Sequence, residues 1–280
     1  MSKKSQSEAR CMAQALLSEN IVFLDTETTG LGTDDEIIEI SIIGKHGEIL
    51  LDTLIKPVRS IPESASRIHN ITDWDVRGSP AWPEIYQDYR DAVKNKTVII
   101  YNRRFDNRLL RQTCGKYHVA TPRIKTICLM ELYSLYEGVI NRRTGGYKWF
   151  KLIDAIENNN IMTIGSFHRA LSDVCASRKL LYFIAGKDEY LDINESEEKL
   201  VSMFNLFYSK NELKEEQKPL STERFRGSNN NESTEKNNHK NKKDNLPDGR
   251  KSSGISCFGI LLFMMSCVTL VIMAMNIFKR

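Results

Sequence analysis

The sequence predicts an α/β protein with a mixed β-sheet flanked by helices, and three observations support this fold class. The apolar run 21–24 is typical of a strand buried on both faces. Two segments rich in Ile and Leu follow at 36–43 and 48–57, separated by a turn that contains glycine, which indicates an antiparallel continuation. From residue 82 onward helical patterns alternate with short apolar runs, as expected when helices cover a sheet.

The first strand delivers two carboxylates. Asp25 and Glu27 are separated by one residue, and because side chains alternate along a strand, both project from the same face. Neighbouring anionic groups repel each other, and a bound cation keeps them together at low cost. Taken alone, Asp-x-Glu at a strand end is more often a pair of solvated charges. A metal site therefore needs partners from elsewhere in the chain.

One candidate partner follows a later strand. Residues 97–101 form a short apolar run, and a helix is predicted at 106–117, so Asp106 lies in its first turn. A carboxylate there is stabilised by the helix dipole, which makes simple capping the alternative role. The other predicted elements are a short helix at 12–17, a partly helical connection at 61–71, a helix at 82–93 that Pro83 opens, and further alternating segments at 124–135, 148–158 and 171–183.

The last candidates are His168 and Asp173. Residues five apart on a helix point about 140° away from each other, so these side chains cannot converge if both are helical. They converge if His168 lies in the preceding loop, which Gly165 permits, and Asp173 lies in the first turns of the helix. An isolated surface histidine and an exposed aspartate are the alternative.

Taken in order, these motifs resemble the DnaQ-like 3′-to-5′ exonucleases of the DEDDh group, of the RNase T and exonuclease X type. The resemblance covers about residues 21–185 and rests chiefly on the segments Phe23–Leu31 and His168–Asp173. It implies an RNase H-like fold, a mixed sheet flanked by helices. The middle motif differs from the family pattern, because Arg103 and Arg104 stand where small side chains are usual.

The resemblance also implies the chemistry. Asp25, Glu27 and Asp173 would hold one Mg²⁺ or Mn²⁺, Asp25 would bridge to a second ion, and Asp106 would support that second ion through water. His168 would take the proton from the attacking water, a role that suits a side chain titrating near neutrality. Two ions per active site match the in-line displacement of a phosphodiester. All five residues are therefore candidate catalytic residues.

Substrate contacts are predicted around this site. By resemblance, Thr28, Thr29, Leu31 and Asn102 would touch the terminal nucleotide, with Leu31 as a wedge against the last base. The expected partner is the 3′ end of a single-stranded nucleic acid, DNA in preference to RNA. Phosphate contacts or stacking surfaces could come from basic and aromatic residues that are otherwise solvated, namely Arg103, Arg104, Arg108, Arg111, Arg142, Arg143, Lys148, Tyr147 and Trp149.

Three other functions remain open. An exoribonuclease fits the same residues, because nothing in the motifs reports whether a 2′-hydroxyl is tolerated. A catalytically silent nucleic-acid-binding module and the proofreading subunit of a polymerase are the others. No protein partner is identified by the sequence.

Composition limits the compartment and the partners. The net charge is +4, but eight Lys or Arg against five Asp or Glu lie in 221–253 and two more cations end the chain, so the first 220 residues are close to neutral. Nucleic-acid affinity must therefore come from local clusters of cations. The six cysteines form no C-x-x-C pair, which argues against a disulfide scaffold and a zinc cluster.

The composition also predicts the domain organisation. We expect an N-terminal helical extension, the exonuclease domain, a charged helical extension, a disordered linker and one transmembrane helix, at 1–19, 20–186, 187–220, 221–253 and 254–278. The last segment carries no charge, and as a helix it would reach about 37 Å, enough to cross a bilayer. We expect a single-pass tail anchor in a lipid bilayer with the exonuclease domain in the cytoplasm.

Overall fold

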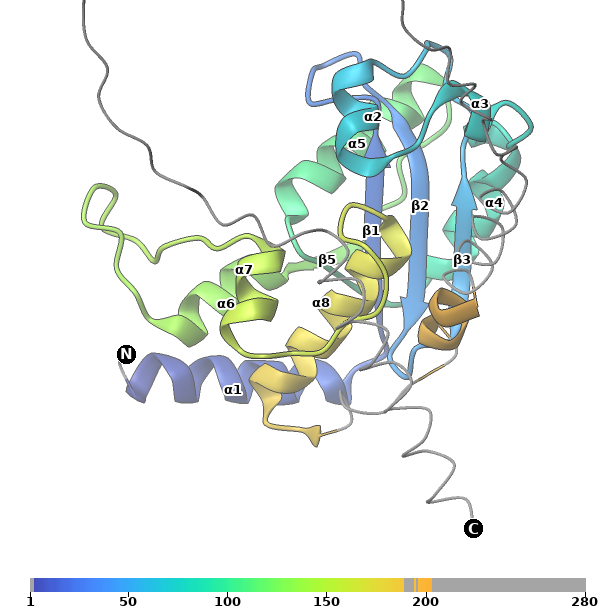
Figure 1. The fold of residues 1–280 in the computed structure, drawn as a ribbon. Helices are drawn as coiled ribbons and strands as arrows, with labels where there is room; N and C mark the ends of the chain where they lie inside the picture. Colours follow the sequence, from blue (N-terminus) through green and yellow to red (C-terminus); the bar gives the residue numbers. More distant parts are fainter. Residues whose placement is uncertain (1–2, 189–193, 195, 203–280) are drawn as a thin grey trace, which may run out of the picture. The chain divides into compact units, whose positions relative to one another are not determined.

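The computed structural model describes residues 3–188, 194 and 196–202, which contain a five-stranded mixed sheet of order β3-β2-β1-β4-β5 (Figure 1). The strands are β1 (Ile21–Thr28), β2 (Ile37–Gly44), β3 (Ile49–Leu54), β4 (Thr97–Ile100) and β5 (Lys125–Cys128). β1 to β3 pair antiparallel, whereas β4 and β5 run parallel to β1. The predicted fold class, a mixed sheet flanked by helices, is confirmed.

Helices cover both faces of the sheet. They are α1 (Lys3–Ser18), α2 (Glu63–His69), α3 (Asp73–Val76), α4 (Trp82–Val93), α5 (Arg103–Lys116), α6 (Leu129–Glu137), α7 (Leu152–Asn158) and α8 (Ala170–Ala185). Buried side chains of α4 and α5 form one core with the sheet, and those of α1, α6, α7 and α8 form a second core on the opposite face (Figure 1).

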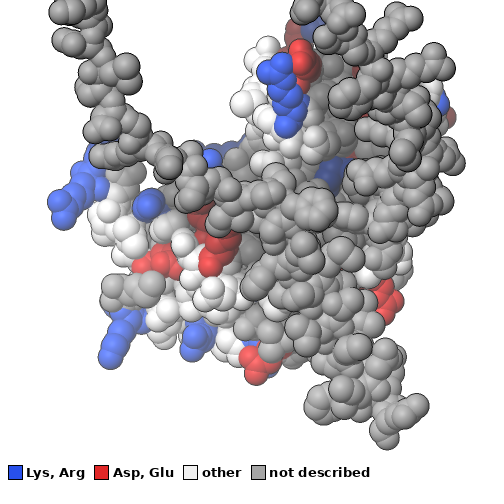
Figure 2. All heavy atoms as spheres, viewed as in Figure 1, with Lys and Arg blue, Asp and Glu red and all other residues white. Residues whose placement is uncertain are grey.

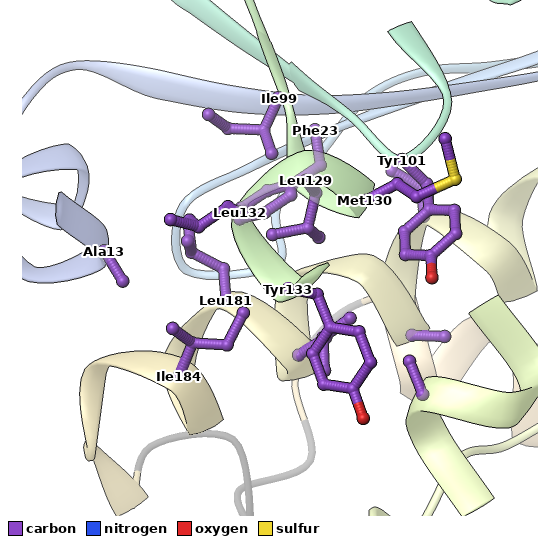
Figure 3. Packing of buried hydrophobic residues seen from close by; sticks show 14 of the residues in the cluster. Ala13, Phe23, Ile99, Tyr101, Leu129, Met130, Leu132, Tyr133, Leu181 and Ile184 are labelled. Atoms are coloured by element: carbon purple, nitrogen blue, oxygen red, sulfur yellow. The ribbon is translucent and has the colours of Figure 1, made fainter. Parts of the chain in front are cut away.

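The alternation of side chains along β1 connects these two cores. Phe23 points to the face covered by α8, where it packs with Ile99, Leu129 and Leu132 (Figure 3). Val22 and Leu24 belong to the core on the opposite face, with α4 and α5. All four residues of the run 21–24 are buried, as the apolar pattern predicts. The strand that carries Asp25 is thus held rigidly from both sides.

β1 extends beyond its parallel neighbour. Its pairing with β4 ends at Phe23 opposite Ile99, whereas its pairing with β2 continues to Thr28. The last residues of β1 therefore have no strand partner on the β4 side. The start of α5 lies beside them there, and Thr26 hydrogen-bonds Asp106. This corner collects groups from several elements.

Some predicted boundaries differ from the structure. The predicted helix 82–93 has the observed bounds of α4, but α5 begins at Arg103, three residues before the expected start. α1 begins at Lys3 and not near residue 12, because the small side chains of Ala9 and Ala13 pack into the core with α6 and α8 and extend the buried face of the helix towards its N-terminus. The connection 61–71 contains α2, and α3 follows directly after it.

Beyond α8, residues 196–202 are helical and pack on the sheet domain. The Ser196 amide donates to the carbonyl of Gly47 at 3.1 Å, and Lys179 of α8 forms a buried ion pair with Glu197 at 2.5 Å. Most of the predicted charged extension, and all of the predicted linker and transmembrane helix, lie outside the described residues. Within the described ranges, every helix falls short of the length and apolarity needed to cross a membrane.

Candidate active site

The site begins at the open end of β1. Asp25 and Glu27 lie on the face covered by α8, and both side chains are partly buried. The intervening Thr26 points to the other face, where its hydroxyl donates to Oδ1 of Asp106 at 2.8 Å. Asp106 lies in the first turn of α5 and is only 3% exposed. This hydrogen bond joins the start of α5 to the acidic end of β1.

α8 supplies two more groups. His168 precedes the helix with φ of +65°, a left-handed conformation that is uncommon for a residue with a side chain, and Arg169 is the N-cap. Asp173 lies in the first turn, and the His168 amide donates to its Oδ2 at 3.2 Å. The loop and helix thus meet both geometric conditions for convergence. Potential ligand atoms of Glu27, His168 and Asp173 all lie within 4.8 Å of one another.

An ion pair between a half-buried arginine and a buried glutamate fixes the start of α8. Glu39 on β2 stands opposite Glu27 in the strand register and is 4% exposed. The guanidinium of Arg169 donates to the Glu39 carboxylate through Nη2 at 2.6 Å and through Nε at 3.1 Å, and the amide of Ala170 donates to its Oε2 at 2.9 Å. Because Arg169 directly follows His168, this two-pronged contact sets the position of the His168 loop.

Sequence reasoning missed the role of Glu39. Glu39 lies in the Ile-rich segment 36–43, whose pattern predicts a strand and no functional residue. The available signal was an acidic residue in the middle of an apolar run, since a charge that is buried in a sheet needs a partner. Nothing in the sequence pointed to Arg169, which lies 130 residues away, as that partner.

Burial makes the charges of these carboxylates costly. Burial and the charges of Asp173, Asp106 and Glu27 raise the pKa of Asp25 well above its usual value. Burial, followed by repulsion from Asp173, raises the pKa of Glu27 to about 8. Burial raises the pKa of Asp106 to about 7 against the hydrogen bond from Thr26, and that of Asp173 to about 7. Burial and neighbouring negative charge therefore oppose ionisation of the cluster, and the nearby Arg169 offsets this only in part at Glu27.

The donor set fits a divalent cation. Oδ1 of Asp173 is buried and has no hydrogen-bond partner among the described residues. An unpaired buried carboxylate oxygen is costly unless a cation or water satisfies it. Carboxylate oxygens are the preferred ligands of hard ions such as Mg²⁺ and Mn²⁺. Glu27, His168 and Asp173 therefore form a candidate metal site with Asp25 beside it.

The predicted nucleotide contacts differ in their accessibility. Leu31 is 78% exposed, and Asn102, the N-cap of α5, is also exposed. Thr28 and Thr29 are buried, and their hydroxyls donate to the carbonyl of Gly30 and to Oδ1 of Asp35. These two hydroxyls stabilise the turn after β1.

The two arginines of the middle motif leave the carboxylate cluster free. Arg103 turns towards β5 and α6, where it donates to the carbonyl of Thr126 at 3.4 Å and pairs with Glu131 at 3.5 Å. The side chain of Arg104 is 73% exposed, and its guanidinium lies 5.6 Å from the ring centre of Trp149. Both arginines therefore contact Glu131 of α6, and neither forms an ion pair with the carboxylates of the site among the described residues.

A surface groove of about 850 Å³ lies at the amino ends of the parallel strands. Its lining includes Arg90, Lys94 and Arg123, near the amino ends of β4 and β5. Because β4 and β5 are parallel to β1, this groove lies at the other end of the strands from the carboxylates. It is separate from the candidate active site.

The electrostatics predict a pH-dependent stability. A carboxyl group with a raised folded-state pKa contributes stability below its unfolded pKa near 4, and this stability is lost as the pH rises through the folded value of about 7 to 8. In EDTA, the wild type should therefore lose more thermal stability between pH 6 and pH 8.5 than Asp25→Asn. We expect a difference of roughly 5 °C in Tm.

Thermal unfolding followed by circular dichroism measures this difference. Asp34→Asn is the matched control, because the Asp34 side chain is 73% exposed. It should follow the wild type, and Mn²⁺ should restore the Tm of the wild type at pH 8.5 more than that of Asp25→Asn. Equal pH slopes for the wild type and Asp25→Asn would contradict the repulsion described above.

Comparison with known proteins agrees with this geometry. Residues 22–181, more than half of the chain, match the exonuclease family of the RNase T type. The uncharacterised exonuclease CP81 of Escherichia phage 186 is 40% identical over 167 residues, which cover 58% of this chain and 86% of that protein. The DNA polymerase III epsilon subunit of Buchnera aphidicola is 34% identical over 124 residues, which cover 39% of this chain and only 50% of that subunit.

Solved structures share the fold. The nuclease domain of 3′hExo, a DEDDh family member that was crystallised with rAMP, superimposes with a TM-score of 0.51 at 18% identity. The match covers 63% of this chain and 96% of that domain. The cell-death related nuclease CRN-4 matches with a TM-score of 0.51 at 16% identity, over 60% of this chain and 64% of that one. From the family match and the phage relative together, the chain belongs to the RNase T-type exonuclease family.

Proposed function

We propose that this protein is a metal-dependent exonuclease that removes nucleotides from the 3′ end of single-stranded DNA. The observation that carries the proposal is that ligand atoms of Glu27, His168 and Asp173 lie within 4.8 Å of one another, beside a buried Asp173 oxygen that has no hydrogen-bond partner in the described part of the chain. In a member of an exonuclease family, this arrangement supports hydrolysis of a phosphodiester bond.

Each acidic residue has a proposed role in holding the ions. Asp25, Glu27 and Asp173 would hold one Mg²⁺ or Mn²⁺, and Asp25 and Asp106 would help to hold a second. When bound, such ions lower the pKa of the attacking water and stabilise the leaving 3′ oxygen. The hydrogen bond from Thr26 fixes the Asp106 carboxylate, so little reorganisation is needed when an ion binds.

His168 is the proposed general base. Its side chain is exposed on the left-handed loop before α8, so a ring nitrogen can accept a proton from water at the cluster and release it to solvent. The amide of the same residue donates to Asp173, which keeps the loop close to the carboxylates. The contact between Arg169 and Glu39 holds the loop from its other side.

The experiment that tests the function uses 5′-labelled single-stranded DNA and RNA of one sequence, in Mg²⁺, Mn²⁺ or EDTA. We expect a metal-dependent ladder that shortens from the 3′ end, faster on DNA than on RNA. Asp173→Asn should lower the rate by more than about 10³-fold, because it removes a metal ligand. His168→Gln should lower it by about 10²- to 10⁴-fold, because it removes the base.

One matched control keeps the residue type and changes only the location. His46→Gln replaces another exposed histidine, in the turn between β2 and β3, and should leave the rate unchanged. Faster cleavage of RNA would make the protein an exoribonuclease. Binding of either polymer without cleavage would make it a silent nucleic-acid-binding module and would end the catalytic proposal.

We also propose that residues 254–278 insert into a membrane and leave the exonuclease domain in the cytoplasm. The support is the uncharged apolar sequence of this segment, which as a helix would reach about 37 Å. In cells, the wild type should resist extraction by alkaline carbonate, whereas Leu262→Lys/Val271→Lys should be released. Ser252→Lys/Ser253→Lys, which lies just outside the segment, is the control. Release of the wild type by carbonate would exclude the anchor.

A further inference from the structure

Residues 138–151, which we name the basic arm, form a separate feature between α6 and α7. The chain leaves α6 at Gly138 and folds back on itself, with an antiparallel bridge between Ile140 and Tyr147. The Asn141 amide donates to the Gly146 carbonyl at 2.8 Å, and the Lys148 amide donates to the Val139 carbonyl at 2.7 Å. Figure 1 shows the arm projecting from the domain at the left of the view. The arm is thus an ordered hairpin.

The composition of the basic arm is one-sided. It contains four cations and no acidic residue, although the first 220 residues together are close to neutral; the cations are Arg142, Arg143, Lys148 and Lys151. Figure 2 shows Lys and Arg atoms at the left, where Figure 1 places the tip of the arm. Two aromatic side chains are exposed between these charges, Trp149 at 53% and Tyr147 at 38%. Alternating cations and exposed rings suit a polyanion that carries flat, stackable groups.

The base of the arm is fixed close to the candidate active site. The hydroxyl of Tyr101, at the carboxyl end of β4, donates to the Phe150 carbonyl at 2.8 Å. Arg104, which precedes Asp106 by two residues on α5, lies with its guanidinium 5.6 Å from the ring centre of Trp149. Arg104 and Trp149 therefore bring a cation and an exposed ring together where the arm meets the start of α5.

We propose that the basic arm binds the single strand on the 5′ side of the nucleotide being removed. Arg142 and Arg143 contact backbone phosphates, and Tyr147 and Trp149 stack on unpaired bases. The inference rests on the proposed exonuclease function and adds to it the segment of substrate that the arm recognises. An anionic lipid surface would also attract these side chains, but the link to the edge that carries Asp106 favours nucleic acid.

Two variants of the full-length chain test the arm, Arg142→Ser/Arg143→Ser and Tyr147→Leu/Trp149→Leu. The control is Lys94→Ser/Arg123→Ser, which removes the same charge from the groove at the amino ends of the parallel strands. The first readout is fluorescence anisotropy with a labelled 16-mer of deoxythymidine in EDTA, which requires no catalysis. We expect each arm variant to bind about 10-fold or more weakly, because one variant loses phosphate contacts and the other loses stacking.

Salt dependence separates the two kinds of contact. The plot of log affinity against log salt should become shallower by about 1.4 for Arg142→Ser/Arg143→Ser, because two phosphate contacts are lost on a single strand. It should stay unchanged for Tyr147→Leu/Trp149→Leu. The charge control should keep the wild-type affinity. An equal loss in the control would assign the effect to overall charge and overturn the proposal.

The second readout is hydrolysis as a function of substrate length, from the nitrophenyl ester of thymidine 5′-phosphate to oligonucleotides of 2, 4, 8 and 16 nucleotides. The ratio of variant to wild-type kcat/KM should fall as the strand grows long enough to reach the arm. An equal loss at every length would overturn the proposal.

The two proposals fail in different ways. Absence of hydrolysis by the wild type at every length defeats the exonuclease function, while the anisotropy assay still decides the arm. Unchanged oligonucleotide affinity in both arm variants defeats the arm proposal. If those variants then bind phosphatidylserine vesicles more weakly than the wild type, the arm contacts a lipid surface.

Discussion

Asp25, Glu27 and Asp173 carry three carboxyl groups into one largely buried corner of the sheet. Burial raises the pKa values of all three, to about 8 for Glu27 and about 7 for Asp173, and the charge of Asp173 adds to the effect for Asp25 and Glu27. The sheet holds the groups together nevertheless, because β1 is fixed by apolar packing on both faces and α8 by its buried side chains. Packing of the core thus stabilises an arrangement of carboxylates that their mutual repulsion opposes.

The short β4 and the ion pair between Glu39 and Arg169 complete this arrangement. Because β4 stops pairing at Phe23, the start of α5 can bring Asp106 to the end of β1 and hydrogen-bond it to Thr26. Glu39 anchors the residue that follows His168 and so holds the proposed base near the carboxylates. This pair contributes no ligand itself, yet it determines where α8 begins relative to β2.

The local patterns of the sequence were sufficient for most of the fold. The buried run before Asp25, the antiparallel strands after it and the helix 82–93 all follow from apolar spacing and turn residues. The position of Asp173 in the first turn of α8 follows from helix geometry, once His168 and Asp173 are required to converge.

Contacts between distant residues could not be predicted in the same way. The pairing of Glu39 with Arg169 depends on the strand register and on the packing of α8, neither of which is encoded locally. The basic arm is likewise not predicted as a unit, because the pattern of residues 148–158 indicates a single element. In the structure, Lys148 belongs to a hairpin and α7 begins only at Leu152.

Counting bound Mn²⁺ tests directly whether the carboxylate cluster binds divalent metal ions. Free Mn²⁺ gives an electron paramagnetic resonance signal that disappears on binding, so titration of the protein at pH 7.5 measures both stoichiometry and affinity. We expect two Mn²⁺ per wild-type chain, and the loss of at least one of them in Asp173→Asn. Binding of Mn²⁺ that is the same in Asp173→Asn as in the wild type would contradict this expectation.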